Sequence, residues 1–220
     1  MSLPDGCARA ARPPLPASRP LLVAFGLAAL TDLGALLAGP HSLHVMAKPL
    51  LMPLLAAYAY TRGAPGPLIA ALLLGWGGDT LLLSGADPAF LAGMACFAAG
   101  HVCYLALFRR ARPRPLFGAG YVVVLVAAVA ALWPGLPAGL RVPVAGYSLL
   151  LAAMAYRAGG LGPRAGIGGA LFLVSDTLIA TGVAGWPQLP HPDFWVMATY
   201  LLAQYLLTDG VLRASTPVAS

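Results

Sequence analysis

The sequence predicts an all-α, polytopic membrane protein with eight transmembrane helices. Hydrophobic residues make up 60% of the 220 residues and charged residues only 9%, and the mean hydropathy is +0.82. A soluble domain could hardly sustain this balance, because it needs a polar surface. Eight apolar runs each approach the roughly 20 residues that a helix needs to cross a bilayer. Loops that contain arginines also alternate along the chain with loops that have almost none.

The eight apolar runs follow one another with short joining segments. Glycine and proline in those segments, as in "RGAPGP" and "RRARPRP", are typical of helix ends. The runs lie near residues 21–38, 44–62, 66–84, 88–108, 116–133, 141–158, 165–183 and 193–212.

The segment before the first run, residues 1–19, is rich in proline, alanine and arginine, which is typical of a disordered tail. A signal peptide is the competing interpretation, but the apolar run that follows is long, carries Asp32 and lacks a clear small-residue cleavage site. We therefore expect a disordered cytoplasmic tail over 1–19, an eight-helix transmembrane domain over 20–213 and a cytoplasmic C-terminal tail over 214–220.

Arginine placement predicts the orientation. Arginines precede the first run and follow the second, fourth, sixth and eighth, whereas the intervening loops have almost none. Basic loops stay in the cytoplasm, so both termini should be cytoplasmic, and we expect a bacterial plasma (inner) membrane. The net charge of +6 comes from these loop arginines, which can face anionic lipid headgroups. Nucleic acid is therefore not an expected partner.

Two similar hexapeptides suggest an internal repeat. "GDTLLL" at 78–83 and "SDTLIA" at 175–180 lie in the third run of each half of the chain. Two parallel four-helix units, with a site at their interface, would place them equivalently. Chance similarity in a protein rich in leucine and alanine explains one shared hexapeptide equally well.

Four charged residues lie well inside apolar runs, four or more residues from either end. An ionised side chain in mid-bilayer costs at least ~2.5 kcal/mol, so such residues usually pair or mark a functional path. Helix rise places Asp32, Asp79, Asp176 and Lys48 in one layer, roughly 6 to 11 Å below the outer boundary. One lysine cannot neutralise three acids, so at least one carboxyl should stay protonated and could serve acid and base chemistry. Structural pairing between helices is the alternative.

The fourth run carries a histidine and a tyrosine on one helical face. Phe90, Gly93, Phe97, His101 and Tyr104 follow three- and four-residue steps. Helix rise puts His101 some 20 Å from the outer end, deeper than the acid layer, so whether it reaches the acids stays open. The eighth run offers a comparable face, formed by Tyr200, Gln204, Tyr205 and Asp209.

Other polar motifs are weaker. His41 and His44 of "HSLH" are expected in an outer loop and, even with His191, lack the cysteine or glutamate that would complete a metal site. The glycines of "GWGGD" are expected to allow close helix packing beside Asp79. We expect no metal and no cofactor.

Several motifs in this order resemble the YhhN-like family of integral membrane proteins, which includes the lysoplasmalogenases. They are "AKPLLMPLL", "GWGGDTLLL", the Phe90-to-Tyr104 pattern, "GALFLVSDTLIA" and "YLLAQYLLTDG", and they span most of residues 30–210. The resemblance implies an eight-helix membrane hydrolase that cleaves the vinyl ether bond of lysoplasmalogens, releasing a fatty aldehyde and a glycerophospho-ethanolamine or -choline. Its functional positions correspond to Lys48, Asp79, His101, Tyr104 and Asp176.

Vinyl ether hydrolysis suits these residues. A proton must reach the β-carbon, and water then captures an oxocarbenium-like cation. We predict Asp79 and Asp176 as the catalytic pair, and the supporting residues are Lys48, His101, Tyr104 and, from depth alone, Asp32. The expected partners are a lysophospholipid substrate and membrane lipids. A proton-coupled transporter is the alternative function, since buried acids with a lysine also form proton relays; a membrane scaffold is a third.

Overall fold

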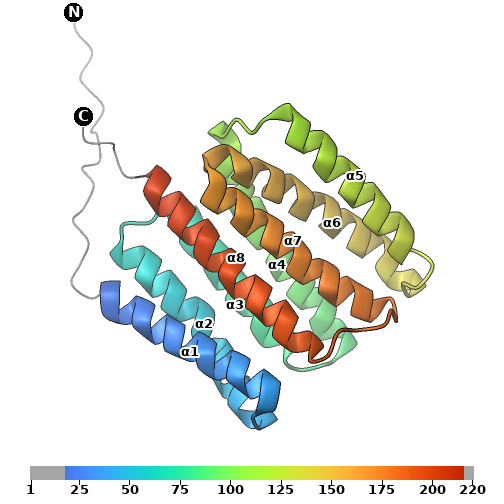
Figure 1. Cartoon of the computed structure of the whole chain (residues 1–220), viewed down its shortest axis with the longest axis horizontal. Helices are drawn as coiled ribbons and strands as arrows, with labels where there is room; N and C mark the ends of the chain where they lie inside the picture. Colours follow the sequence, from blue (N-terminus) through green and yellow to red (C-terminus); the bar gives the residue numbers. More distant parts are fainter. Residues whose placement is uncertain (1–17, 216–220) are drawn as a thin grey trace, which may run out of the picture.

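The computed structural model describes residues 18–215, and within that range it contains helices and no strand. Eight α-helices follow one another, with short 3-10 turns after α4 and α6 (Figure 1). Their bounds are α1 (Ser18–Ala38), α2 (His41–Thr61), α3 (Gly66–Leu82), α4 (Asp87–Leu107), α5 (Pro115–Leu132), α6 (Ala138–Ala158), α7 (Pro163–Val183) and α8 (Pro192–Ala214). The all-α prediction is confirmed, and each helix covers one predicted apolar run. Most of the two predicted tails, residues 1–17 and 216–220, lies outside the described residues.

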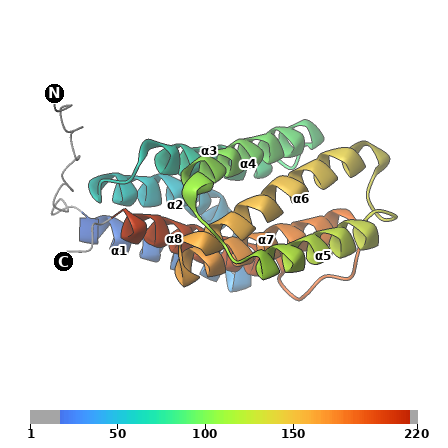
Figure 2. The ribbon, with the colours of Figure 1, turned by 90° about the horizontal axis from the view of Figure 1, so that it is seen from above.

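The helices alternate in direction and form two layers. In Figure 2, α2, α3 and α4 lie above α1, α8, α7 and α5, and α6 slants between the layers. The α1–α2, α3–α4, α5–α6 and α7–α8 connections lie at one end of the bundle, which we call the distal end (Figure 1). The start of α1 and the end of α8 lie at the opposite end, the proximal end.

Six of the eight helices are long and apolar enough to cross a membrane, namely α1, α2, α4, α5, α6 and α7. Helix α3 is apolar but has only 17 residues. Helix α8 is the longest, with 23 residues, and carries polar side chains that a lipid-facing helix could not tolerate. Its Tyr200, Gln204 and Thr208 are buried, whereas Trp195 and Leu202 are more than 40% exposed, so one face of α8 packs into the bundle and the other lies at its surface.

The outer surface of the bundle is apolar, unlike the surface of a soluble protein. Helix α5 exposes Val122, Val123 and Val126, each by at least 60%. Buried polar side chains, including Asp32, Asp79 and His101, lie inside the bundle instead. An apolar exterior, with the few polar side chains kept inside the protein, is the arrangement that a lipid environment favours.

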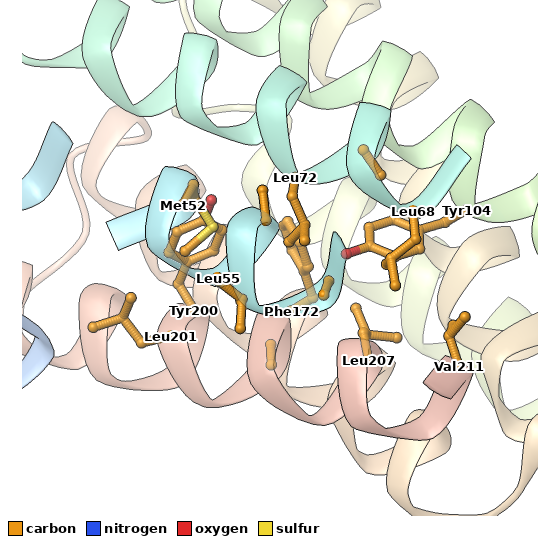
Figure 3. Close-up of a cluster of buried hydrophobic side chains, with 14 of the residues drawn as sticks. Met52, Leu55, Leu68, Leu72, Tyr104, Phe172, Tyr200, Leu201, Leu207 and Val211 are labelled. Atoms are coloured by element: carbon orange, nitrogen blue, oxygen red, sulfur yellow. The ribbon is translucent and has the colours of Figure 1, made fainter. Parts of the chain in front are cut away.

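A central apolar cluster holds the layers together (Figure 3). Met52 and Leu55 of α2 and Leu72 of α3 meet Phe172 of α7 and side chains of α8. The labelled α8 members are Tyr200, Leu201, Leu207 and Val211, with Leu68 and Tyr104 completing the set. The buried polar side chains of the bundle lie among these packed apolar side chains.

Glycines allow α3 and α4 to pack closely. A Cβ atom on Gly78 would lie 2.5 Å from the Phe97 ring, and one on Gly93 would lie 3.2 Å from the Gly78 carbonyl oxygen. A Cβ atom on Gly75 would lie 3.0 Å from the Tyr200 hydroxyl. The packing role predicted for the "GWGGD" glycines is therefore confirmed at Gly75 and Gly78, and it brings aromatic side chains up to Asp79.

Candidate active site

Asp79 ends a chain of four buried side chains. Its Oδ2 atom accepts a hydrogen bond from the Tyr200 hydroxyl at 2.8 Å. Tyr200 in turn accepts from Gln204 Nε2 at 3.3 Å, and Gln204 Oε1 accepts from the Tyr104 hydroxyl at 2.7 Å. Asp79 is only 3% exposed. The structure thus links the predicted residues Asp79 and Tyr104, through two side chains of α8.

Asp176 belongs to a second chain, built from α7, α6 and α4. The Tyr147 hydroxyl donates a hydrogen bond to Asp176 Oδ2, and His101 Nε2 lies 3.0 Å from the same hydroxyl. Because Tyr147 gives its only proton to Asp176, His101 Nε2 must be the donor to Tyr147. His101 is therefore linked to Asp176 through the Tyr147 hydroxyl group.

The far side of the His101 ring has no polar contact. Its Nδ1 atom is buried and lacks a hydrogen-bond partner among the described residues. The ring packs edge-on against Phe172, with 4.8 Å between centroids. A neutral imidazole with its proton on Nε2 fits these surroundings, because an imidazolium would bury an unpaired N–H.

Asp32 pairs with a histidine that the sequence analysis placed elsewhere. Its Oδ1 atom lies 2.8 Å from His44 Nδ1, and Asp32 is fully buried. The expectation of an outer loop at His41 and His44 was wrong, because α2 begins at His41, directly after Pro40. The charge count that considered only Lys48 as a cationic partner therefore omitted His44.

Lys48 forms no ion pair within 4.0 Å in the part of the chain that the structure covers. It is half-buried on α2, one turn after His44. Its ammonium group lies within electrostatic range of Asp32 and Asp79. The predicted supporting residues Lys48 and Asp32 are thus on the Asp79 side of the site.

Three aromatic rings connect the two aspartate chains. Phe97, Phe172 and Tyr200 contact one another edge to face, with centroids 5.4 to 6.4 Å apart. No hydrogen bond between the carboxyls of Asp79 and Asp176 is present within residues 18–215, although they lie within electrostatic range of each other. Each aspartate instead has its own tyrosine donor.

An apolar cavity of about 90 Å³, the inner cavity, opens onto Asp176 and Tyr147. Side chains of α4, α5, α6 and α7 form most of its wall, and Phe97 contributes an aromatic ring. Both Asp176 and Tyr147 are partly exposed to it, whereas Asp79 and Lys48 do not line it. The two aspartates therefore differ in access, a difference that the sequence did not predict.

A second cavity of about 270 Å³, the distal cavity, lies at the distal end of the bundle. It shares three lining residues with the inner cavity, namely Leu82, Phe90 and Val183. Its remaining wall comes from the α3–α4 turn and the start of α6.

Some hydrogen-bond partners of the aspartates were not predicted from the sequence, and others had no predicted role. Tyr147 and the bond between His44 and Asp32 were not predicted, and Tyr200 and Gln204 were noticed only as one face of the last run. A usable signal was present at Tyr147, because a tyrosine in mid-run needs a partner for its hydroxyl. Identifying that partner requires knowing which helices are neighbours.

Comparisons with known proteins identify the family. The YhhN family model matches residues 43–211. Lysoplasmalogenase TMEM86B of Homo sapiens is 33% identical over 72% of this chain and 67% of its own length, and TMEM86B of Sus scrofa is 36% identical over 74% of each. The lysoplasmalogenase of Mycobacterium tuberculosis is 34% identical over 65% of this chain and 59% of its own. No solved structure matches the chain. With its apolar helices and these relatives, this integral membrane protein belongs to the YhhN family.

Proposed function

We propose that this protein is a lysoplasmalogenase, which hydrolyses the vinyl ether bond of a lysoplasmalogen to a fatty aldehyde and a glycerophospho-ethanolamine or -choline. The named relatives support the activity. One observation carries it for this chain: a carboxyl, Asp176, faces an apolar cavity and is held by a tyrosine. A cavity of that character can admit the hydrocarbon next to the ether, and the carboxyl can supply the proton.

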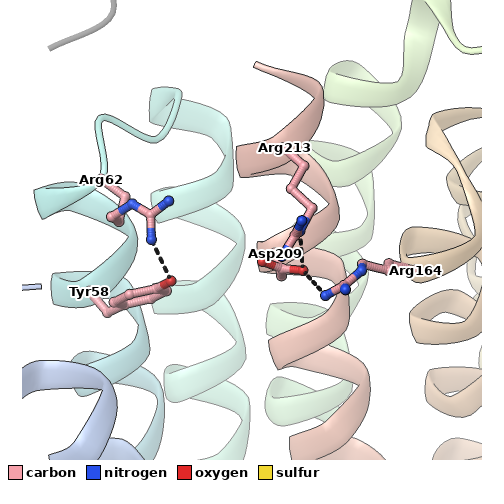
Figure 4. A network of polar contacts seen from close by, with 5 residues as sticks. All are labelled: Tyr58, Arg62, Arg164, Asp209 and Arg213. Atoms are coloured by element: carbon pink, nitrogen blue, oxygen red, sulfur yellow. Dashed lines mark hydrogen bonds and ion pairs between the residues drawn. The ribbon is translucent and has the colours of Figure 1, made fainter. Parts of the chain in front are cut away.

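All eight helices cross the membrane in this proposal, with both termini in the cytoplasm of a bacterial cell. The arginine pattern supports this orientation, since Arg62, Arg164 and Arg213 lie at the proximal end of the bundle. Figure 4 draws them with Asp209, which accepts from Arg164 at 2.7 Å and from Arg213 at 2.8 Å. The pairing neutralises Asp209 near the end of α8, which favours placing that helix in the membrane as well.

Asp176 is the general acid. Its proton passes to the β-carbon of the vinyl ether, and the π electrons of the C=C bond form the new C–H bond. This leaves an oxocarbenium-like cation, which water attacks. Tyr147 keeps donating to Oδ2, so it stabilises the carboxylate that forms as the proton leaves. The carboxylate then takes a proton from the attacking water, and the hemiacetal breaks down to aldehyde and alcohol. One water is consumed and Asp176 is regenerated.

Asp79 supports this chemistry by its charge. It does not line the inner cavity, but it lies within electrostatic range of Asp176. An ionised Asp79 near the reacting centre stabilises the cation, because opposite charges interact strongly where water is scarce. Tyr200 and Lys48 hold that negative charge in place.

The remaining predicted residues position these two. His101 orients Tyr147 by donating to its hydroxyl, and Tyr104 orients Tyr200 through Gln204. Asp32 is hydrogen-bonded to His44, and its negative charge offsets the positive charge of Lys48.

The test is aldehyde release by purified protein in detergent, with no membrane gradient. A vinyl-ether lysolipid should be cleaved, and its saturated alkyl-ether twin should not, because only the vinyl ether has a β-carbon that can accept a proton. Equal turnover of the two, or of neither, would contradict the proposed reaction. A proton-coupled transporter would release no aldehyde and would need vesicles with a pH difference.

A further inference from the structure

We infer that the distal cavity is the headgroup site of the substrate, and that Asp87 recognises the ammonium group of an ethanolamine or choline headgroup there. This inference rests on the proposed function. The two cavities are adjacent, because they share the lining residues Leu82, Phe90 and Val183. A single lipid can therefore occupy both, with its ether in the inner cavity and its polar end in the distal one.

The spacing fits a lysolipid in that orientation. Asp176 and Val183 lie on the same helix, seven residues apart, which corresponds to about 10 Å along the axis. An extended glycerophosphoethanolamine unit spans a similar length between its amine nitrogen and the sn-1 ether oxygen. The hydrocarbon tail would continue past Asp176 along the apolar wall, which includes Val124, Leu151 and Leu173.

Asp87 is the acidic residue in the wall of the distal cavity. Its side chain is exposed, and it makes no ion pair or side-chain hydrogen bond within the described range. Arg141, near the start of α6, is engaged elsewhere: it donates to the Leu136 carbonyl and lies 5.8 Å from the Trp133 ring. The Asp87 carboxylate is thus free to meet a cation that enters the cavity.

The helix dipole offers a competing explanation for Asp87. The residue lies in the first turn of α4, where a negative charge is favourable because of the helix dipole. Asp193 occupies the corresponding place in the first turn of α8, is also exposed, and lines neither cavity. Asp193 therefore provides a matched control, because it is also an acid in the first turn of a helix but lies outside the proposed headgroup site.

The experiment measures binding of two uncleavable alkyl-ether lysolipids, one with a phosphoethanolamine headgroup and one with a bare phosphate. The wild-type protein in neutral detergent should bind the phosphoethanolamine form about fivefold more tightly, as expected for one solvent-accessible charge pair. Asp87→Asn should remove that preference, and Asp193→Asn should keep it. Raising the salt concentration should weaken the preference of the wild-type protein, because salt screens the proposed charge pair. This second test needs no variant.

Several results would overturn the inference. One is an unchanged headgroup preference in Asp87→Asn, and another is an equal loss in Asp193→Asn. A wild-type preference that is absent, or insensitive to salt, would also contradict it. If aldehyde is released and Asp87→Asn keeps the preference, only the headgroup site fails. If no vinyl-ether lysolipid is cleaved while the preference depends on Asp87, the hydrolase proposal fails and the binding site stands.

Discussion

Tyr147 donates a hydrogen bond to Asp176, and both side chains line the inner cavity. The donor comes from α6 and the acceptor from α7, so the packing of two helices sets the position of the carboxyl. His101 on α4 fixes the tyrosine from the other side. A substrate in the cavity would meet a carboxyl that is already oriented, which is the arrangement that acid catalysis requires.

Removing the Tyr147 hydroxyl should lower kcat. Tyr147→Phe keeps the ring and deletes the donor, and a hydrogen bond to a charged group contributes about 1.5 to 3 kcal/mol. We expect kcat for aldehyde release to fall roughly 10- to 100-fold. Tyr156→Phe is the control, because Tyr156 lies on the same helix and outside the cavity wall. Equal kcat in the two variants would show that Tyr147 has no part in the reaction.

The two aspartates should respond unequally to substitution. Asp176→Asn removes the proposed proton donor, so kcat should fall at least about 100-fold, the usual contribution of a general acid. Asp79→Asn removes a charge at a distance, so about a tenfold loss is expected, equivalent to ~1.4 kcal/mol. Both are measured as aldehyde release at saturating substrate, with Asp193→Asn as the unaffected control. Equal losses at positions 79 and 176 would contradict this division of roles.

The helices could be predicted from the sequence because each must satisfy its own backbone hydrogen bonds in lipid. That requirement makes every span a long apolar run, and the runs at 116–133 and 165–183 match α5 and α7 within two residues. The start of α2 was harder to predict, since His41 and His44 resemble a polar loop. In the structure His44 is buried, because Asp32 of α1 satisfies its ring.

The partners of the aspartates could not be predicted in the same way. Helix α6 is apolar all round its mid-section, so nothing in its sequence indicates that Tyr147 faces α4 and α7. The two aspartates share a hexapeptide context, yet Asp79 is bonded from α8 and Asp176 from α6. Helix neighbours decide these contacts, and the neighbours are set by packing over the whole bundle. The parallel repeat stays a prediction.

Tyr104→Phe should cost stability more than activity. The change leaves Gln204 Oε1 without its donor inside the protein, and a buried unpaired acceptor costs about 1 to 3 kcal/mol. We expect a lower midpoint of thermal unfolding in detergent and a smaller fall in kcat than for Tyr147→Phe. Tyr60→Phe is the matched control, since Tyr60 is 69% exposed. An unchanged midpoint for Tyr104→Phe would contradict a stabilising role for the hydrogen bonds that link Tyr104 to Asp79.

Gly78→Ala should disturb both the fold and the cavity. The added methyl would lie 2.5 to 2.9 Å from three carbons of the Phe97 ring. That ring cannot move freely, because it packs edge to face against Phe172 and Tyr200. Overpacking of this kind costs about 1 to 3 kcal/mol. The thermal midpoint should fall, and KM should change because Phe97 lines the inner cavity.

Two further variants test the cause of that effect. Gly34→Ala places a methyl in open space on α1, so it should leave the midpoint unchanged or raise it slightly through better helix propensity. Combining Gly78→Ala with Phe97→Leu relieves the clash, so the double variant should be more stable than the sum of the two single effects implies. Additive losses of stability in the double variant would mean that Gly78 is needed for a reason other than making room for the Phe97 ring.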